Sequence, residues 1–136
     1  MRLALHKKIG ILGGTSPEST VLYYQRIVRR YQDLFGDHGY PEIIIYSVSF
    51  QKFRNWMDRD EWDNLAEGVI EGIRHLSAAG ADFGIMATNT MHIVFDQVKK
   101  KAPIPLISII DATAESIRKK GVRKIGLLGT VFTMEK

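Results

Sequence analysis

The chain has 136 residues, of which 45% are hydrophobic and 25% charged, and its formal net charge is +4. This balance is that of a globular chain with one compact core, and it excludes an intrinsically disordered protein. No apolar run approaches the roughly 20 residues of a membrane span, and the first residues lack the apolar core of a signal peptide. We therefore expect a cytoplasmic protein without a membrane partner. The sequence contains no cysteine, which excludes disulfides, thiolate metal ligands and thiol nucleophiles, and we expect no metal site.

Basic residues occur in small groups, at residues 29–30, 99–101, 119–120 and 123–124. They are not interleaved with aromatic residues, and no motif of a nucleic-acid-binding domain accompanies them. We interpret them as solvated helix ends and expect no nucleic-acid partner.

Short apolar segments alternate with segments of helical periodicity along the chain. The apolar segments predict strands at residues 8–13, 42–50, 81–87, 105–110 and 124–129. The periodic segments predict helices at residues 17–35, 62–79, 93–101 and 113–120, with a polar loop between residues 50 and 62. Apolar strands that alternate with helices belong to a parallel sheet that is covered on both faces. We expect an α/β fold with a doubly wound parallel sheet and helices on both faces.

The stretch "KKGVRK" at residues 119–124 follows the last predicted helix. It is either a hinge between two domains or a plain helix-to-strand turn that the glycine closes.

Ligands of open α/β sheets bind beyond the carboxyl ends of the strands, and three such ends carry unusual residues. The first is "GGTSPEST", residues 13–20, where two glycines permit a tight turn and Pro17 can open a helix whose free N–H groups favour an anion. The stretch lacks the third glycine of a dinucleotide fingerprint and the Gly-Lys-Ser/Thr of a phosphate loop. It predicts a site for a carboxylate or a single phosphate, or else only a turn and a helix cap.

The second strand end carries Thr88, Asn89 and Thr90, with His92 two residues later. Three consecutive hydrogen-bonding side chains would hold a carboxylate and an amino group. Alternatively, Asn89 and Thr90 only cap the following helix, and His92 is a satisfied structural residue. The third end places the hydroxyl of Thr130 after the last predicted strand.

The stretches "IGILGGTSPESTVLYYQRIV", "GADFGIMATNTMH" and "KIGLLGTVFTMEK" resemble motifs of the aspartate/glutamate racemase family. This resemblance implies enzymes that invert the α-carbon of acidic amino acids without a cofactor. It implies two similar α/β domains with the active site in the cleft between them and one cysteine base from each domain. Residues 1–120 then form the first domain, and residues 121–136 form the hinge and the first strand of a second domain. The expected ligand is an acidic amino acid or a dicarboxylate.

The same resemblance implies the residues of the site. Substrate contacts fall on Thr15, Thr88, Asn89, Thr90 and Thr130, and Met57 lies near a position where relatives carry a polar contact. Relatives usually have cysteine where this chain has Thr88, the expected catalytic position. A thiol ionises near pH ~8.5, whereas an alcohol has no comparable anionic population at neutral pH. Thr88 could act only if a neighbour took its proton, and His92 is the nearest candidate.

The resemblance also predicts that the second cysteine lies beyond residue 136. We therefore expect a truncated racemase-like chain that is inactive alone, with a last strand, "IGLLG", whose exposed edge pairs with a second copy. Two other interpretations stay open: a non-catalytic carboxylate-binding domain, and a piece of a longer active enzyme.

Overall fold

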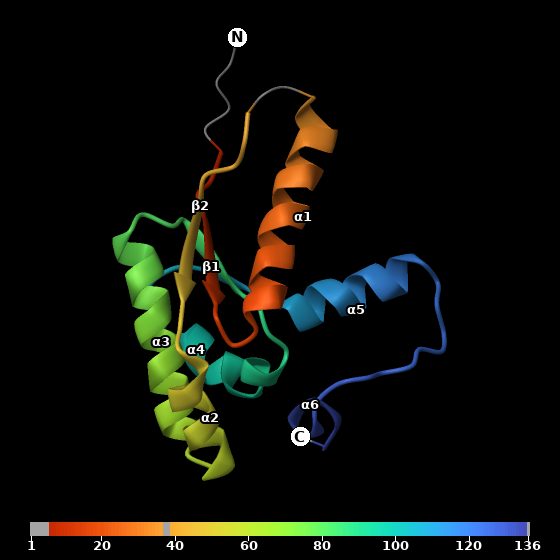
Figure 1. Ribbon diagram of the computed structural model, residues 1–136. Coiled ribbons are helices and arrows are strands. Elements are labelled where there is room, and N and C mark those ends of the chain that lie inside the picture. The colour runs from red at the N-terminus through yellow and green to blue at the C-terminus, as the bar shows by residue number, and fades with distance from the viewer. Residues whose placement is uncertain (1–5, 37–38, 136) are drawn as a thin grey trace.

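The computed structural model describes residues 6–36 and 39–135. Its elements in chain order are β1 (Ile9–Gly13), α1 (Pro17–Phe35), β2 (Ile43–Ser47), α2 (Phe50–Asp58), α3 (Trp62–Ala78), β3 (Phe83–Met86), the 3-10 helix η1 (Thr90–Val94), α4 (Phe95–Lys101), β4 (Leu106–Ile107), α5 (Ile109–Lys119) and α6 (Val131–Glu135) (Figure 1).

The strands form one parallel sheet of four in the order β2-β1-β3-β4. Side chains alternate between its faces. Leu12 and Met86 belong to the core on the α3 side, whereas Ile11 and Ile85 pack with Tyr23 of α1 on the other side. Helices thus cover both faces, and the predicted doubly wound α/β fold is confirmed.

Helix α3 supplies more residues to the larger core than any other element. Its residues Leu65, Val69, Ile73 and Leu76 are completely buried. Burial of one such side chain stabilises the fold by roughly 1.5–3 kcal/mol. This stripe was predicted from its helical spacing, and it fixes the sheet against α3.

Helix α1 begins and ends where its local signals predict. Ser16 caps it by accepting a hydrogen bond from the Ser19 N–H (3.3 Å), and Pro17 fills its first position, where no N–H is needed. Gly36 closes it in the left-handed conformation, at φ 64°.

Helix α2 lies where we expected a polar loop, so that expectation is wrong. Its apolar residues Phe53 and Met57 are buried against α3, with Trp56 partly buried beside them. Polar residues surround this narrow stripe, which gives the segment the composition of a loop. Only the packing against α3 shows that the stripe is buried.

The predicted strand at residues 124–129 does not form. Gly121, at φ 66°, closes α5 as in a helix-to-turn junction, but residues 122–130 have no regular structure. A strand needs a neighbour to receive its N–H and C=O groups, and residues 123–129 find no such partner within the described ranges. The predicted first strand of a second domain is therefore corrected to an unpaired segment that leads into α6.

Strand β4 is also shorter than predicted, because Ser108 caps α5 through a hydrogen bond from the Asp111 N–H (3.1 Å).

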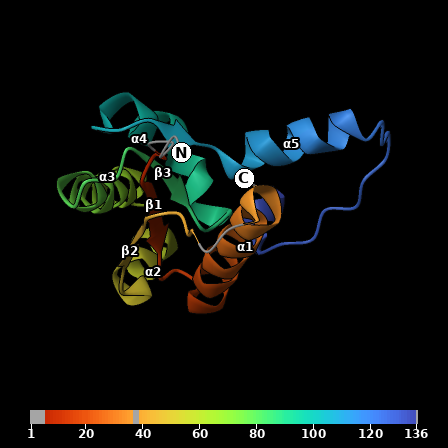
Figure 2. The ribbon, with the colours of Figure 1, turned by 90° about the horizontal axis from the view of Figure 1, so that it is seen from above.

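Helix α5 buries none of its residues and projects away from the sheet (Figures 1 and 2). The following segment returns α6 to α2 and α3, where the rings of Phe132 and Trp62 lie 6.3 Å apart. None of the described helices is long and apolar enough to cross a bilayer.

Candidate functional site

The strand order reverses direction between β1 and β3, and the general rule for open α/β sheets predicts a ligand crevice at this point. The chain leaves β1 for β2 on one side, whereas β3 and β4 lie on the other, so the loops after β1 and β3 diverge at this point. The two loops start as neighbours, because the Ala87 N–H donates to the Leu12 carbonyl (2.9 Å). Thr15 and Thr88 therefore follow the two strand ends that border the crevice.

The turn after β1 depends on close backbone approach. Gly14 has φ +93°, and a Cβ added there would collide with the backbone of Val48. The Thr20 hydroxyl accepts from the Gly14 N–H (3.1 Å) and donates to the Ser16 carbonyl (3.0 Å). The turn and helix cap predicted as the simpler alternative are therefore present.

Thr15 stands out within this turn. Its Oγ1 is buried and has no hydrogen-bond partner among the described residues. Leaving a buried hydroxyl without a partner costs roughly 1–3 kcal/mol, and such groups are rare in folded proteins. The turn thus contains one buried hydroxyl whose hydrogen-bonding capacity is unsatisfied within the described residues.

The loop after β3 does not behave as a helix cap. Asn89 makes no capping hydrogen bond through its side chain, which is exposed, although its carbonyl accepts from the His92 N–H (2.9 Å). The capping role considered for Asn89 is therefore wrong. The hydroxyl of Thr90 lies 3.4 Å from that of Thr130, and either can donate. Two predicted site residues 40 positions apart thus meet.

His92 is buried and both of its ring nitrogens have partners. Nε2 lies 3.3 Å from the Ile109 N–H, which can only donate, so Nε2 is the acceptor. Nδ1 then carries the proton and donates to the Thr88 carbonyl at 2.8 Å. Neither nitrogen is left for the Thr88 hydroxyl, so this geometry does not support His92 as its base.

The surroundings of His92 favour the neutral ring. Burial lowers the pKa of His92 below its usual value, and the hydrogen bond to the Thr88 carbonyl and the charge of Asp111 offset this only in part. The ring stacks on Phe95 at 5.1 Å with an interplanar angle of 4°. This is the environment of a satisfied structural histidine.

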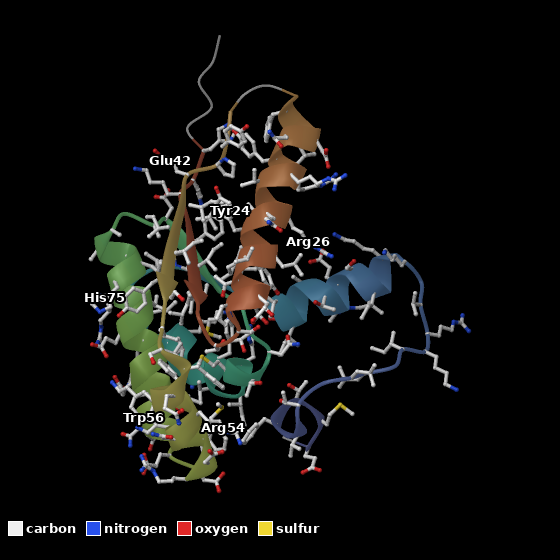
Figure 3. The ribbon with its side chains drawn as sticks, in the orientation of Figure 1. Tyr24, Arg26, Glu42, Arg54, Trp56 and His75 are labelled. Carbon is white, nitrogen blue, oxygen red and sulfur yellow. The ribbon has the colours of Figure 1, made fainter. Side chains whose placement is uncertain are left out.

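Met57, Thr90 and Thr130 line one hollow of about 420 Å³ together with Arg54 and residues of α6. Arg54 is not among the site residues predicted from the sequence, because the sequence predicts a loop where α2 presents it. Its guanidinium pairs with Asp58 (2.8 Å) and lies 5.9 Å from the ring of Phe132. Figure 3 shows Arg54, in the middle of α2, on the side of this helix that faces α6. The hollow therefore combines two hydroxyls with a permanent cation.

A larger hollow, of about 570 Å³, lies along α1 and includes Ile9 at the start of β1 and Pro41 before β2. It is at the amino ends of these strands, away from the crevice, so volume alone does not mark the predicted site. No three His, Asp or Glu side chains of residues 6–36 and 39–135 gather closely enough to hold a metal ion.

The family described as Asp/Glu/Hydantoin racemase matches residues 12–136. RacX, the broad specificity amino-acid racemase of Bacillus subtilis, is 29% identical over 131 residues, which are 93% of this chain and 56% of RacX.

Two solved structures are similar to the chain. The crystal structure of an Asp/Glu racemase candidate from Yersinia pestis matches with a TM-score of 0.88 and 38% identity, and covers 96% of this chain and 56% of that protein. An aspartate racemase homologue from Pyrococcus horikoshii matches with a TM-score of 0.78 and 44% identity, over 86% of this chain and 51% of that one. The chain thus spans about half the length of these relatives.

Proposed function

Because the chain belongs to the Asp/Glu/Hydantoin racemase family, we propose that its β1–β3 crevice binds an acidic amino acid and forms one face of a cofactor-independent racemase site. The observation that carries this proposal is the buried, unpartnered hydroxyl of Thr15 at the edge of the crevice. A ligand carboxylate would supply the missing partner and offset the cost of burying the hydroxyl.

The polar groups around the crevice divide into two sets. Thr15, Thr88 and Asn89 follow the strand ends and would hold the α-carboxylate and the amino group. Arg54, Thr90 and Thr130 line the neighbouring hollow and would hold the side-chain carboxylate. A guanidinium is suited to this task because it donates two parallel hydrogen bonds to a carboxylate.

Racemisation requires a base on one face of the α-carbon and an acid on the other. Thr88 occupies the base position implied by the family resemblance, but its hydroxyl supplies almost no alkoxide at neutral pH. Both nitrogens of the nearby His92 are already hydrogen-bonded. We therefore expect the 136-residue chain to bind the amino acid without racemising it by itself.

A second candidate function is a carboxylate-binding domain without catalysis. The absence of cysteine from the 136 residues favours it. The two candidates share the ligand and differ in whether the α-hydrogen exchanges with solvent.

We also propose that residues 1–120 form a domain that carries the ligand-binding strand ends, that the following segment adds Thr130, and that two copies pair through this segment. Leu128 is 94% exposed and Leu127 57% exposed. Burial of these side chains against a second copy would remove apolar surface from water and stabilise the dimer. Light scattering should then report a dimer that Leu128→Lys converts to a monomer.

Calorimetric titration of the chain with L-aspartate, L-glutamate and citrate tests the binding proposal. We expect weak, millimolar binding, because a single domain supplies only part of the cleft. The decisive variant is Thr15→Val, which keeps the shape of the side chain and removes the orphan hydroxyl. It should leave the melting temperature unchanged or higher, yet abolish binding. Thr113→Val, on exposed α5, is the matched control and should bind normally.

Absence of heat with all three ligands at millimolar protein would overturn the proposal. Normal binding by Thr15→Val would also overturn the role of this hydroxyl.

A further inference from the structure

His92 connects two segments that are far apart in the sequence. Its Nδ1–H donates to the carbonyl of Thr88, in the loop after β3, and its Nε2 accepts from the N–H of Ile109, the first residue of α5. The ring is held between these contacts by its stacking on Phe95 and is only 8% exposed. One side chain thus joins the loop after β3 to the start of α5.

The contact at α5 requires a neutral ring. The first N–H groups of a helix lack partners within the helix, and here the Ile109 N–H is satisfied by His92 and the Asp111 N–H by Ser108. A protonated imidazole has no acceptor and would place a positive charge at the positive end of the helix. Asp111, on α5, is the charged group that acts on the ring among the described residues, and it opposes this effect only in part.

The contact at Thr88 fixes a peptide plane. In a planar trans peptide the C=O of one residue and the N–H of the next point in opposite directions. Because the Thr88 carbonyl points to His92, the Asn89 N–H points away from it, and that N–H has no acceptor within the described ranges. A fixed, free N–H beside the crevice is the kind of donor that stabilises an anionic ligand.

We infer that His92 is a positioning residue whose neutral imidazole ties the Thr88 carbonyl to the first amide of α5 and so aims the Asn89 N–H at the ligand. The role of the Asn89 N–H in ligand binding rests on the proposed function. The tie, meaning the two hydrogen bonds by which His92 joins Thr88 to Ile109, does not. Loss of the tie weakens binding because the Asn89 N–H is no longer held in place.

A positioning role of His92 and a direct contact between His92 and the ligand predict opposite changes of affinity with pH. An imidazolium that touched the ligand carboxylate would tighten binding as the pH falls. The tie predicts weaker binding on acidification, since the imidazolium cannot accept from Ile109. The direction of the pH dependence therefore separates a positioning role from a binding role.

The tie is tested first in the unmodified chain, by nitrogen-15 NMR of the imidazole rings. We expect the Nδ1–H tautomer for His92. His75, which is exposed on α3 beside Tyr46 of β2, serves as the reference ring (Figure 3). An Nε2–H tautomer of His92 at neutral pH would overturn the inference whether or not any ligand binds.

Two substitutions then separate hydrogen bonding from packing. His92→Phe keeps a flat ring over Phe95 but loses both hydrogen bonds, so the exchange of the Ile109 amide hydrogen should become roughly tenfold faster. His92→Gln retains one donor and one acceptor and should restore most of the protection. His75→Phe is the matched control and should change neither Ile109 exchange nor binding.

Binding of L-aspartate and citrate is measured on the same variants. We expect weaker binding by His92→Phe, rescue by His92→Gln, and weaker binding by the unmodified chain at pH 5.5 than at pH 7.5. Unchanged Ile109 exchange in His92→Phe would refute the tie. Altered exchange with unchanged affinity would refute its role in aiming the ligand donor, and no binding by any variant would refute the proposed function alone.

Discussion

Gly14 offers a direct test of how closely the backbone packs beneath the crevice. The perturbation is Gly14→Ala, and the chain provides an unusually close control in Gly80→Ala. The two glycines have almost the same backbone angle, φ +93° and φ +96°. They differ in their surroundings, because a Cβ on Gly14 would collide with the backbone of Val48, whereas a Cβ on Gly80 would meet nothing within 4 Å.

The expected magnitudes follow from this difference. A side chain in the left-handed region costs about 1–2 kcal/mol, and both variants incur this cost. The added collision at Gly14 involves backbone atoms, which must shift together with the β1–β2 pairing, and overpacking of this kind costs about 1–3 kcal/mol more. We therefore expect a loss of roughly 1–2 kcal/mol for Gly80→Ala and roughly 2–5 kcal/mol for Gly14→Ala.

Urea unfolding, followed by the fluorescence of Trp56 and Trp62, measures both losses. With an m-value of about 2 kcal/mol per molar urea, the midpoint of Gly14→Ala should lie roughly 1 M below that of Gly80→Ala. Equal midpoints for the two variants would refute the argument, because they would mean that the turn relaxes around a Cβ without cost.

Three further predictions concern catalysis, pH and packing. Proton NMR of L-aspartate and L-glutamate in deuterated buffer should show no exchange of the α-hydrogen by the unmodified chain, and Thr88→Cys should produce no racemisation; ready racemisation by the unmodified chain would contradict the proposed site. Because the pKa of His92 is lowered in the folded chain, the unfolded chain binds more protons on the acidic side, so stability should fall as the pH decreases below about 6.5 and hold above it. His92→Gln should show a smaller fall in urea midpoint between pH 7.5 and pH 5.5. Ile73→Ala, at a completely buried site, should cost about 2–5 kcal/mol in urea unfolding, against about 0.5 kcal/mol or less for Ile110→Ala, which is 51% exposed; similar losses would contradict the assigned core.

Elements with local signals were predicted closely from the sequence. Helix α1 has its cap at Ser16, its proline at the first position and its closing glycine within the chain that forms it. The buried stripe of α3 and the apolar run of β3 likewise depend on spacing between near neighbours. The physical reason is that caps, turns and periodic faces involve residues only a few positions apart.

Elements that depend on a distant partner were not predicted. Helix α2 is recognisable as a helix through the packing of Phe53 and Met57 on α3. The expected strand at residues 124–129 had the right composition, but a strand exists only where another strand accepts its hydrogen bonds. Composition could not reveal the absence of that partner.

For the candidate site, the sequence by itself determined which chemistry is available: hydroxyls and an amide at strand ends, and no thiol anywhere in the 136 residues. Only the tertiary structure decided how these groups are used. It left the Thr15 hydroxyl without a partner, engaged both nitrogens of His92, and brought Arg54 to the hollow that Thr90 and Thr130 share. The reason is that hydrogen-bond satisfaction and charge placement depend on atoms from several elements, and their positions are set only when the whole chain has packed.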